Sequence, residues 1–276
     1  MLAATILALM SAGLHASWNF MVKTSDDRFL AAWGQFLFGG LIFAPVLVVT
    51  GIPNLGEVWP YLLASGLVHI AYIGGLTTAY HHGDFSLAYP LARGSGALLS
   101  AVGGVLFLGD VLNPWAWVAI VVVLVGLLAL VGRQVTYVSV AWALATGACI
   151  GTYTTIDAAG SRASDGLAYG IAVTIAGALA LTLAGTVTGR LGDLGRALPF
   201  AWRRYALAGV FLTVAYTLVM IAVQWAPVGY VAVLRESSVM VGALAGWVLL
   251  KERLGGRRLA ASAVVASGLA LLVVVR

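Results

Sequence analysis

The stretch YPLARGSGALLSAVGGVLFLGDVL (89–112) has a counterpart in VAVLRESSVMVGALAGWVLLKERL (231–254), and these two segments together decide the fold. They align without a gap. Polar and small residues coincide at several places: Arg93 with Arg235, Ser95 with Ser237, Gly104 with Gly246 and Asp110 with Glu252. Aligned ionisable residues inside apolar segments are rare by chance. We therefore interpret the chain as two related halves, residues 1–135 and 136–276.

The composition is that of a membrane protein. Of the 276 residues, 62% are hydrophobic and only 9% are charged, and the mean hydropathy is +1.02. A soluble domain has about 45–50% apolar and about 25% charged residues, so a water-soluble enzyme is excluded. We assign the net charge of +5 to loops that orient the chain in a membrane, and not to nucleic-acid binding. The single cysteine, Cys149, excludes an intrachain disulfide.

The apolar runs predict the topology. Each is close to the length of about 20 residues that crosses a bilayer as a helix. They cover residues 2–22, 30–50, 59–80, 86–108, 114–132, 138–158, 166–188, 204–224, 228–250 and 258–275, with residues 189–203 as the longest loop. Five spans per half force the second half to enter the membrane with the opposite orientation. We thus predict an all-α integral membrane protein with ten transmembrane helices in two inverted five-helix repeats around a central cavity. Inverted repeats are typical of secondary transporters, whose substrate site lies at mid-membrane between the halves.

The basic residues predict the orientation. Loops on one side hold Lys23, Arg28, Arg133, Arg190, Arg196, Arg203, Arg204, Lys251, Arg253, Arg257 and Arg258. The other side, which includes both termini, holds only Arg162 and Arg276. Because short cytoplasmic loops carry the excess of Lys and Arg, we expect both termini to face away from the cytoplasm.

These features resemble a known family. YPLARG followed by LFLGD, LRESS followed by LLKERL, HASWN in the first span and TYTTID in the sixth are similar to the EamA-like branch of the drug/metabolite transporter superfamily. The resemblance covers nearly the whole chain. It implies a bacterial inner-membrane transporter of small metabolites, often an exporter, with ten helices around a central cavity; some members with HASWN resemble proteins linked to phosphonate use. The small four-helix exporters of the superfamily carry a Glu in the first span, whereas this chain has His15 and Asn19 there.

Charged residues within the spans are the first candidates for a substrate site. Arg93 and Arg235 occupy equivalent places, and two guanidinium groups meeting at mid-membrane would suit a carboxylate, phosphonate or phosphate. Glu236 is a candidate for proton coupling or for binding an ammonium group, and Asp157 for gating or coupling. The alternative stays open that the arginines only pair with acids, Arg235 with Glu236 or Asp157.

Polar residues at helical spacing add further candidates. His15, Asn19 and Lys23 recur every four residues and so share one helical face, with Trp18 beside them; Lys23 is also a gating candidate. His69 and Tyr72 form a similar face on the third span. Tyr153 and Tyr216 complete the predicted cavity wall. For a lone His, a hydrogen bond to a nearby carbonyl is the alternative, and for aromatics it is the membrane-interface belt.

No metal site or cofactor is expected. Adjacent His81 and His82 point apart on a helix and have no third ligand at suitable spacing. A GxxxxGK[ST] motif for nucleotide phosphates is absent from the sequence.

We therefore predict a secondary transporter, not an enzyme, that moves an organic anion or zwitterion such as an amino acid or phosphonate by alternating access, in export or exchange. Its partners would be the small-molecule substrate, the lipid bilayer and, in a coupled cycle, protons, with no nucleic acid; a monomer and a homodimer both remain open. One alternative is a transporter of neutral or cationic molecules in which both arginines are structural. The other is a non-transporting membrane scaffold or enzyme.

Overall fold

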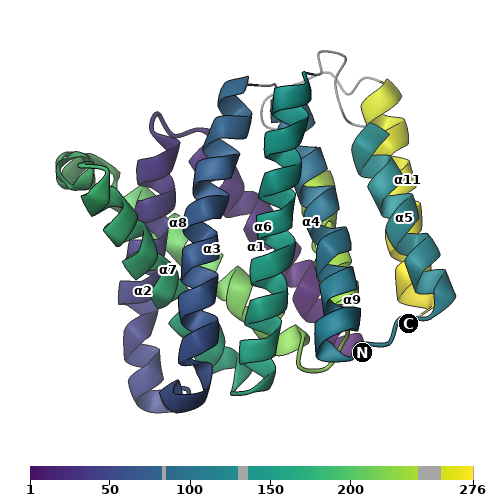
Figure 1. The fold of residues 1–276 in the computed structure, drawn as a ribbon, viewed down its shortest axis with the longest axis horizontal. Helices are drawn as coiled ribbons and strands as arrows, with labels where there is room; N and C mark the ends of the chain where they lie inside the picture. The colour runs from purple at the N-terminus through teal and green to yellow at the C-terminus, as the bar shows by residue number, and fades with distance from the viewer. Residues whose placement is uncertain (83–84, 130–135, 242–255, 276) are drawn as a thin grey trace.

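The computed structural model describes residues 1–82, 85–129, 136–241 and 256–275, and nearly all of them are helical. The helices are α1 (Leu2–Lys23), α2 (Arg28–Thr50), α3 (Leu55–His82), α4 (Phe85–Leu108), α5 (Pro114–Ala129), α6 (Tyr137–Arg162), α7 (Gly166–Val187), α8 (Leu191–Ala222), α9 (Val228–Leu234) and α11 (Gly256–Val274) (Figure 1). No strand occurs within the described ranges, so the prediction of an all-helical protein is confirmed.

Length and hydropathy fit a bilayer. Among the described residues, six helices are long and apolar enough to cross one, and two shorter apolar helices, 114–129 and 260–274, stand beside them. Large apolar side chains cover the outside, with Val49 at 87% and Phe107 at 78% exposure. In water such a surface would be costly, whereas lipid tails accept it.

The predicted loop over residues 189–203 is wrong. Helix α8 begins at Leu191, and only a short turn separates it from α7. Gly and Pro199 in this stretch favour a break, but Leu194, Leu198, Ala201 and Tyr205 recur at helical spacing and pack against the apolar cluster around Trp33 of α2. Tertiary packing therefore outweighs the local breakers.

The predicted continuous helix over residues 228–250 is also wrong in its described part. Helix α9 ends at Leu234, a turn covers Arg235 and Glu236, and helix resumes at residues 237–241. The turn is closed by tight bonds between residues three apart, such as Glu236 N–H to the Val233 carbonyl at 3.0 Å. The break falls at the two adjacent charged residues.

Helices α5 and α11 pair in a reciprocal way. They run side by side at one edge of the molecule, in opposite directions, with the C-terminus at their foot and the N-terminus at the same end of the molecule, below α4 and α9 (Figure 1). A Cβ atom built on Gly126 would lie 2.7 Å from Val265 Cγ2, and one built on Gly268 would lie 2.7 Å from Val123 Cγ2. Such mutual contact is the signature of two-fold symmetry, and it supports the predicted inversion of the two halves.

This geometry predicts the effect of filling the interface. Gly126→Ala and Gly268→Ala should each lower the midpoint of thermal unfolding in detergent by a similar amount, because overpacking a tight contact costs about 1–3 kcal/mol. Gly74→Ala on α3 is the matched control, since a Cβ there meets nothing within 4 Å, and its unfolding midpoint should stay equal or rise. Equal midpoints for all three variants would contradict the reciprocal packing.

Candidate functional site

Arg93 and Glu236 form a buried ion pair between the two halves. Arg93 lies on α4 and Glu236 in the turn after α9. The Arg93 guanidinium donates through Nη2 to Oε1 at 2.6 Å and through Nε to Oε2 at 3.2 Å. The two residues are only 7% and 2% exposed. This two-bond geometry neutralises both charges in a medium where an unpaired charge is very costly.

Arg235 is buried as well, but it is held differently. Its Nη2 atom lies 3.5 Å from Nδ1 of His15 on α1, and its Cζ atom lies 5.8 Å from the centre of the Tyr216 ring on α8. Among the described residues it makes no ion pair, and its Nε–H has no hydrogen-bond acceptor. The alternative in which Arg235 pairs with Glu236 is not the arrangement seen, because Glu236 binds Arg93.

Two further donors, on α1 beyond His15, also lack acceptors. The His15 and Trp18 rings are in edge contact, with centroids 4.6 Å apart, and the buried indole Nε1–H of Trp18 has no partner. Asn19, one residue further along α1, leaves its side-chain Nδ2 unpaired. Within the described part of the chain the further buried polar atoms of this kind are Gln35 Oε1, Arg204 Nε and the hydroxyls of Thr213, Thr217 and Ser238. Buried polar groups are normally satisfied, so the unpaired donors of Arg235, Trp18 and Asn19 could accept a ligand that carries hydrogen-bond acceptors.

An aromatic wall adjoins these donors. His69 of α3 stacks on Tyr153 of α6 with centroids 4.3 Å apart, and Tyr72 packs on both rings. Tyr153 continues the wall to Tyr216 at 6.5 Å. The His69 Nδ1 atom hydrogen-bonds to the Ser65 carbonyl at 2.8 Å, the ordinary local bond expected for a lone histidine. Six of the sequence-predicted residues thus lie in one connected cluster with Arg235: His15, Trp18, His69, Tyr72, Tyr153 and Tyr216.

Asp157 lies at the edge of this cluster and is completely buried. Tyr169 on α7 donates its hydroxyl to Oδ1 at 3.0 Å, and Tyr216 donates to Oδ2. The sequence made Asp157 a candidate for gating or coupling, and the structure surrounds its side chain with protein. Tyr169 was missed; its only signal was that it is the single tyrosine of the apolar helix α7.

The two ends of the molecule each carry an ion pair that joins the halves. At the end with the termini, Asp110 binds Arg162 at 2.8 Å and accepts the Val228 backbone N–H at 2.6 Å, while Arg162 also donates to the Val223 carbonyl. Asp110 is 8% exposed at its side chain. The sequence marked Asp110 only as part of the repeat and did not predict this contact.

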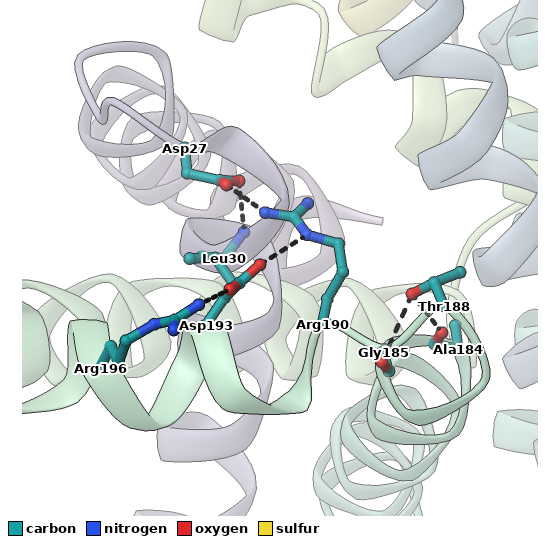
Figure 2. Close-up of polar contacts among 8 residues, drawn as sticks. All are labelled: Asp27, Leu30, Ala184, Gly185, Thr188, Arg190, Asp193 and Arg196. Carbon is teal, nitrogen blue, oxygen red and sulfur yellow. Dashed lines mark hydrogen bonds and ion pairs between the residues drawn. The ribbon is translucent and has the colours of Figure 1, made fainter.

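At the opposite end, the Arg190 guanidinium lies between the carboxylates of Asp27 and Asp193, and Arg196 binds Asp193 (Figure 2). The Asp27 side chain also accepts the Leu30 backbone N–H at 3.0 Å and so caps α2. These groups are about a third exposed or more, so they hold the halves together less firmly than the buried Asp110 pair.

A cavity in the structure lies away from this cluster, and several predicted residues are not described. A cavity of about 600 Å³ opens between α3, α4 and α6, and none of the predicted binding residues lines it. The side chains of Lys23, His81 and His82, together with Asp84 and Glu252, lie outside what the structure describes. Among the described residues no group of three His, Cys, Asp or Glu side chains is placed to hold a metal ion.

Comparison with known proteins identifies the family. The model of the EamA-like transporter family matches the chain over residues 2–132 and again over 138–274. A solved structure described as "Crystal structure of protein" shares the fold, with a TM-score of 0.79 and 18% identity over 99% of this chain and 98% of that one. None of the curated proteins matches this sequence. Because the family model covers both halves of the chain, the protein belongs to the EamA-like transporter family and is a membrane transporter of the drug/metabolite type.

Proposed function

We propose that the protein is a secondary transporter of a small organic anion or zwitterion, such as a carboxylate, amino acid or phosphonate. The observation that carries this proposal is the buried Arg235, whose guanidinium has no carboxylate partner among the described residues and contacts His15 of α1. The N–H groups of Trp18 and Asn19, about one turn further along α1, also lack a partner. A planar fork of N–H donors matches the two oxygens of a carboxylate or phosphonate. An anion would satisfy donors that the protein leaves unmet.

The ion pair between Arg93 and Glu236 limits which charged residue is available to bind the substrate. Since Glu236 already neutralises Arg93, the net positive charge offered to a substrate comes from Arg235. We therefore assign substrate binding to Arg235 with His15, Trp18 and Asn19, and aromatic contacts to Tyr153 and Tyr216. Arg93 and Glu236 are assigned to joining the two halves, with Glu236 able to receive an ammonium group only when it parts from Arg93.

Alternating access follows from the cross-half contacts. If residues 1–135 and 136–276 move as two inverted units, the Asp110–Arg162 pair closes one end of the site and the Asp27–Arg190 pair the other. The distribution of Lys and Arg supports an orientation in which the end with the termini faces the outside of a bacterial inner membrane. Export or exchange of the anion then requires the Asp110 pair to open.

Two rival functions make different demands. A transporter of neutral or cationic molecules would leave Arg235 without a role in binding. A scaffold or enzyme would not need a buried, unpaired cation between two halves. Measurements of ligand binding, stability and accessibility separate these functions.

The first prediction concerns Arg235. Purified protein should be stabilised against heat by at least one compound from a panel of amino acids, phosphonates and sugar phosphates, because a ligand stabilises the state that it binds. Arg235→Gln should weaken that affinity at least tenfold, in line with about 1.5–3 kcal/mol for a charged hydrogen bond, and Arg235→Lys should weaken it less. Counterflow of the same compound in proteoliposomes tests transport; full counterflow by Arg235→Gln would favour a neutral or cationic substrate.

The second prediction concerns the ion pair. Arg93→Gln should destabilise the fold by about 3–5 kcal/mol, because it leaves Glu236 buried without a cation. The double variant Arg93→Gln with Glu236→Gln should recover most of that loss, while Arg235→Gln should cost little. Chemical unfolding in detergent of the wild type, these three variants and Glu236→Gln alone measures these energies, and additive effects of the single Gln substitutions at Arg93 and Glu236 would refute the pairing.

The third prediction concerns the closed end. In a Cys149→Ser, Ser11→Cys background, a membrane-impermeant thiol reagent should label position 11 slowly, because Ser11 is fully buried on α1. Asp110→Ala should raise the labelling rate several-fold by opening the end with the termini. Asp193→Ala, at the opposite end, is the control and should leave the rate unchanged. A rate unaffected by Asp110→Ala would contradict the gate.

A further inference from the structure

Asp157 stands out among the buried groups because neutral donors alone contact it. Tyr169 and Tyr216 bind its two oxygens, and the Ser65 hydroxyl on α3 lies within interacting range. No Lys or Arg of the described residues forms an ion pair with it. A buried carboxylate without a cation is costly to keep ionised, so its protonation responds readily to any charge that arrives nearby.

One side chain connects Asp157 with the proposed substrate site. The Tyr216 hydroxyl donates to Asp157, while the ring of the same residue lies beneath the Arg235 guanidinium at 5.8 Å. An anion bound to Arg235 would therefore add a negative charge that only the Tyr216 side chain separates from the Asp157 carboxyl group. Repulsion between the two negative charges favours the protonated form of Asp157.

Among the described residues around Asp157, no other group is better suited to bind a proton. The charged and titratable side chains that face Asp157 or its tyrosine partners are Tyr61 and His69 on α3, Arg93 on α4, Tyr153 on α6 itself, Tyr169 on α7, Tyr216 on α8, and Arg235 and Glu236 after α9. Of these, Glu236 is the other carboxyl group, and its charge is fixed by the two hydrogen bonds from Arg93.

We infer that Asp157 is the proton-binding site of the transport cycle and takes up one proton when an anion binds Arg235. This inference rests on the proposed function. The step is a proton transfer from a hydronium ion to a carboxylate oxygen, which yields a carboxylic acid and water with no change in oxidation state. The proton returns to water when the anion leaves. A monoanion and its proton then cross the membrane together with no net charge, which removes the cost of moving an isolated charge through the low-dielectric interior.

The test measures proton uptake on binding. Acetate and methanesulfonate are fully ionised at pH 8, so any proton taken up belongs to the protein. Titration calorimetry of the full-length protein in two buffers of different ionisation enthalpy gives the number of protons bound per anion. We expect an uptake that approaches one proton in the wild type and falls to zero in Asp157→Asn. Asp26→Asn, at an exposed carboxyl group between α1 and α2, is the matched carboxyl-to-amide control and keeps its uptake.

The outcomes separate the two proposals. Anion binding without proton uptake in the wild type overturns the role of Asp157 and leaves the proposed function intact. Failure of both anions, and of the amino acids, phosphonates and sugar phosphates, to bind the wild type overturns both. Undiminished uptake in Asp157→Asn overturns the assignment to this residue.

A second variant covers the case in which Asp157→Asn does not fold. Tyr169→Phe keeps the carboxyl group but removes one hydroxyl that stabilises its ionised form. The pH range over which proton uptake occurs should then move to higher pH. An unchanged pH range in Tyr169→Phe overturns the inference.

Discussion

Charge compensation within the membrane interior is the constraint on which this site depends. Arg93 and Glu236 come from opposite halves and satisfy each other with two hydrogen bonds, so neither half can fold its charged residue inward without the other. An ion of either sign left alone there would be far more costly than in water. Because the acid next to Arg235 in the chain is used in this way, Arg235 is left with His15 and an aromatic face. The identity of the pair therefore decides which arginine remains for a ligand.

An ion pair joins the two halves at each end of the molecule, but the two pairs differ in how deeply they are buried. The Asp110–Arg162 pair is largely buried and also holds a backbone N–H of α9, whereas Asp27 and Arg190 are each about a third exposed. Water and salt weaken the exposed pair more than the buried one. Gly126 packs on Val265 and Gly268 packs on Val123, so each half contributes the same kind of contact to this interface. A transporter built this way needs only a small energy difference to favour one closed end over the other.

Composition and the repeat were enough to predict an all-helical membrane protein of this family. Hydropathy and the alignment of the two arginines can be read from the sequence without knowledge of any three-dimensional contact. Helical spacing predicted that His15, Asn19 and Lys23 share one face of α1 with Trp18 beside them, but it did not predict which residues of α6, α8 and the turn after α9 this face would meet. The partner of Glu236 was not predicted either, since Arg93 lies far away in sequence and two acids were equally available to Arg235. The helical start of α8 was hidden because Leu194 and Tyr205 gain their stability from packing against α2, which no local pattern reveals.

The break after α9 explains how two adjacent residues face different partners. In a continuous helix Arg235 and Glu236 would point about 100° apart. The turn that both residues occupy lets Glu236 reach α4 while Arg235 reaches α1 and α8. Backbone groups released by a break must be satisfied inside a membrane. Here the Ser237 hydroxyl donates to the Leu234 carbonyl at 2.8 Å, and Ser238 N–H donates to the Arg235 carbonyl at 3.0 Å. The Ser237 side chain thus has a structural reason to follow the charged pair, because its hydroxyl stabilises the break.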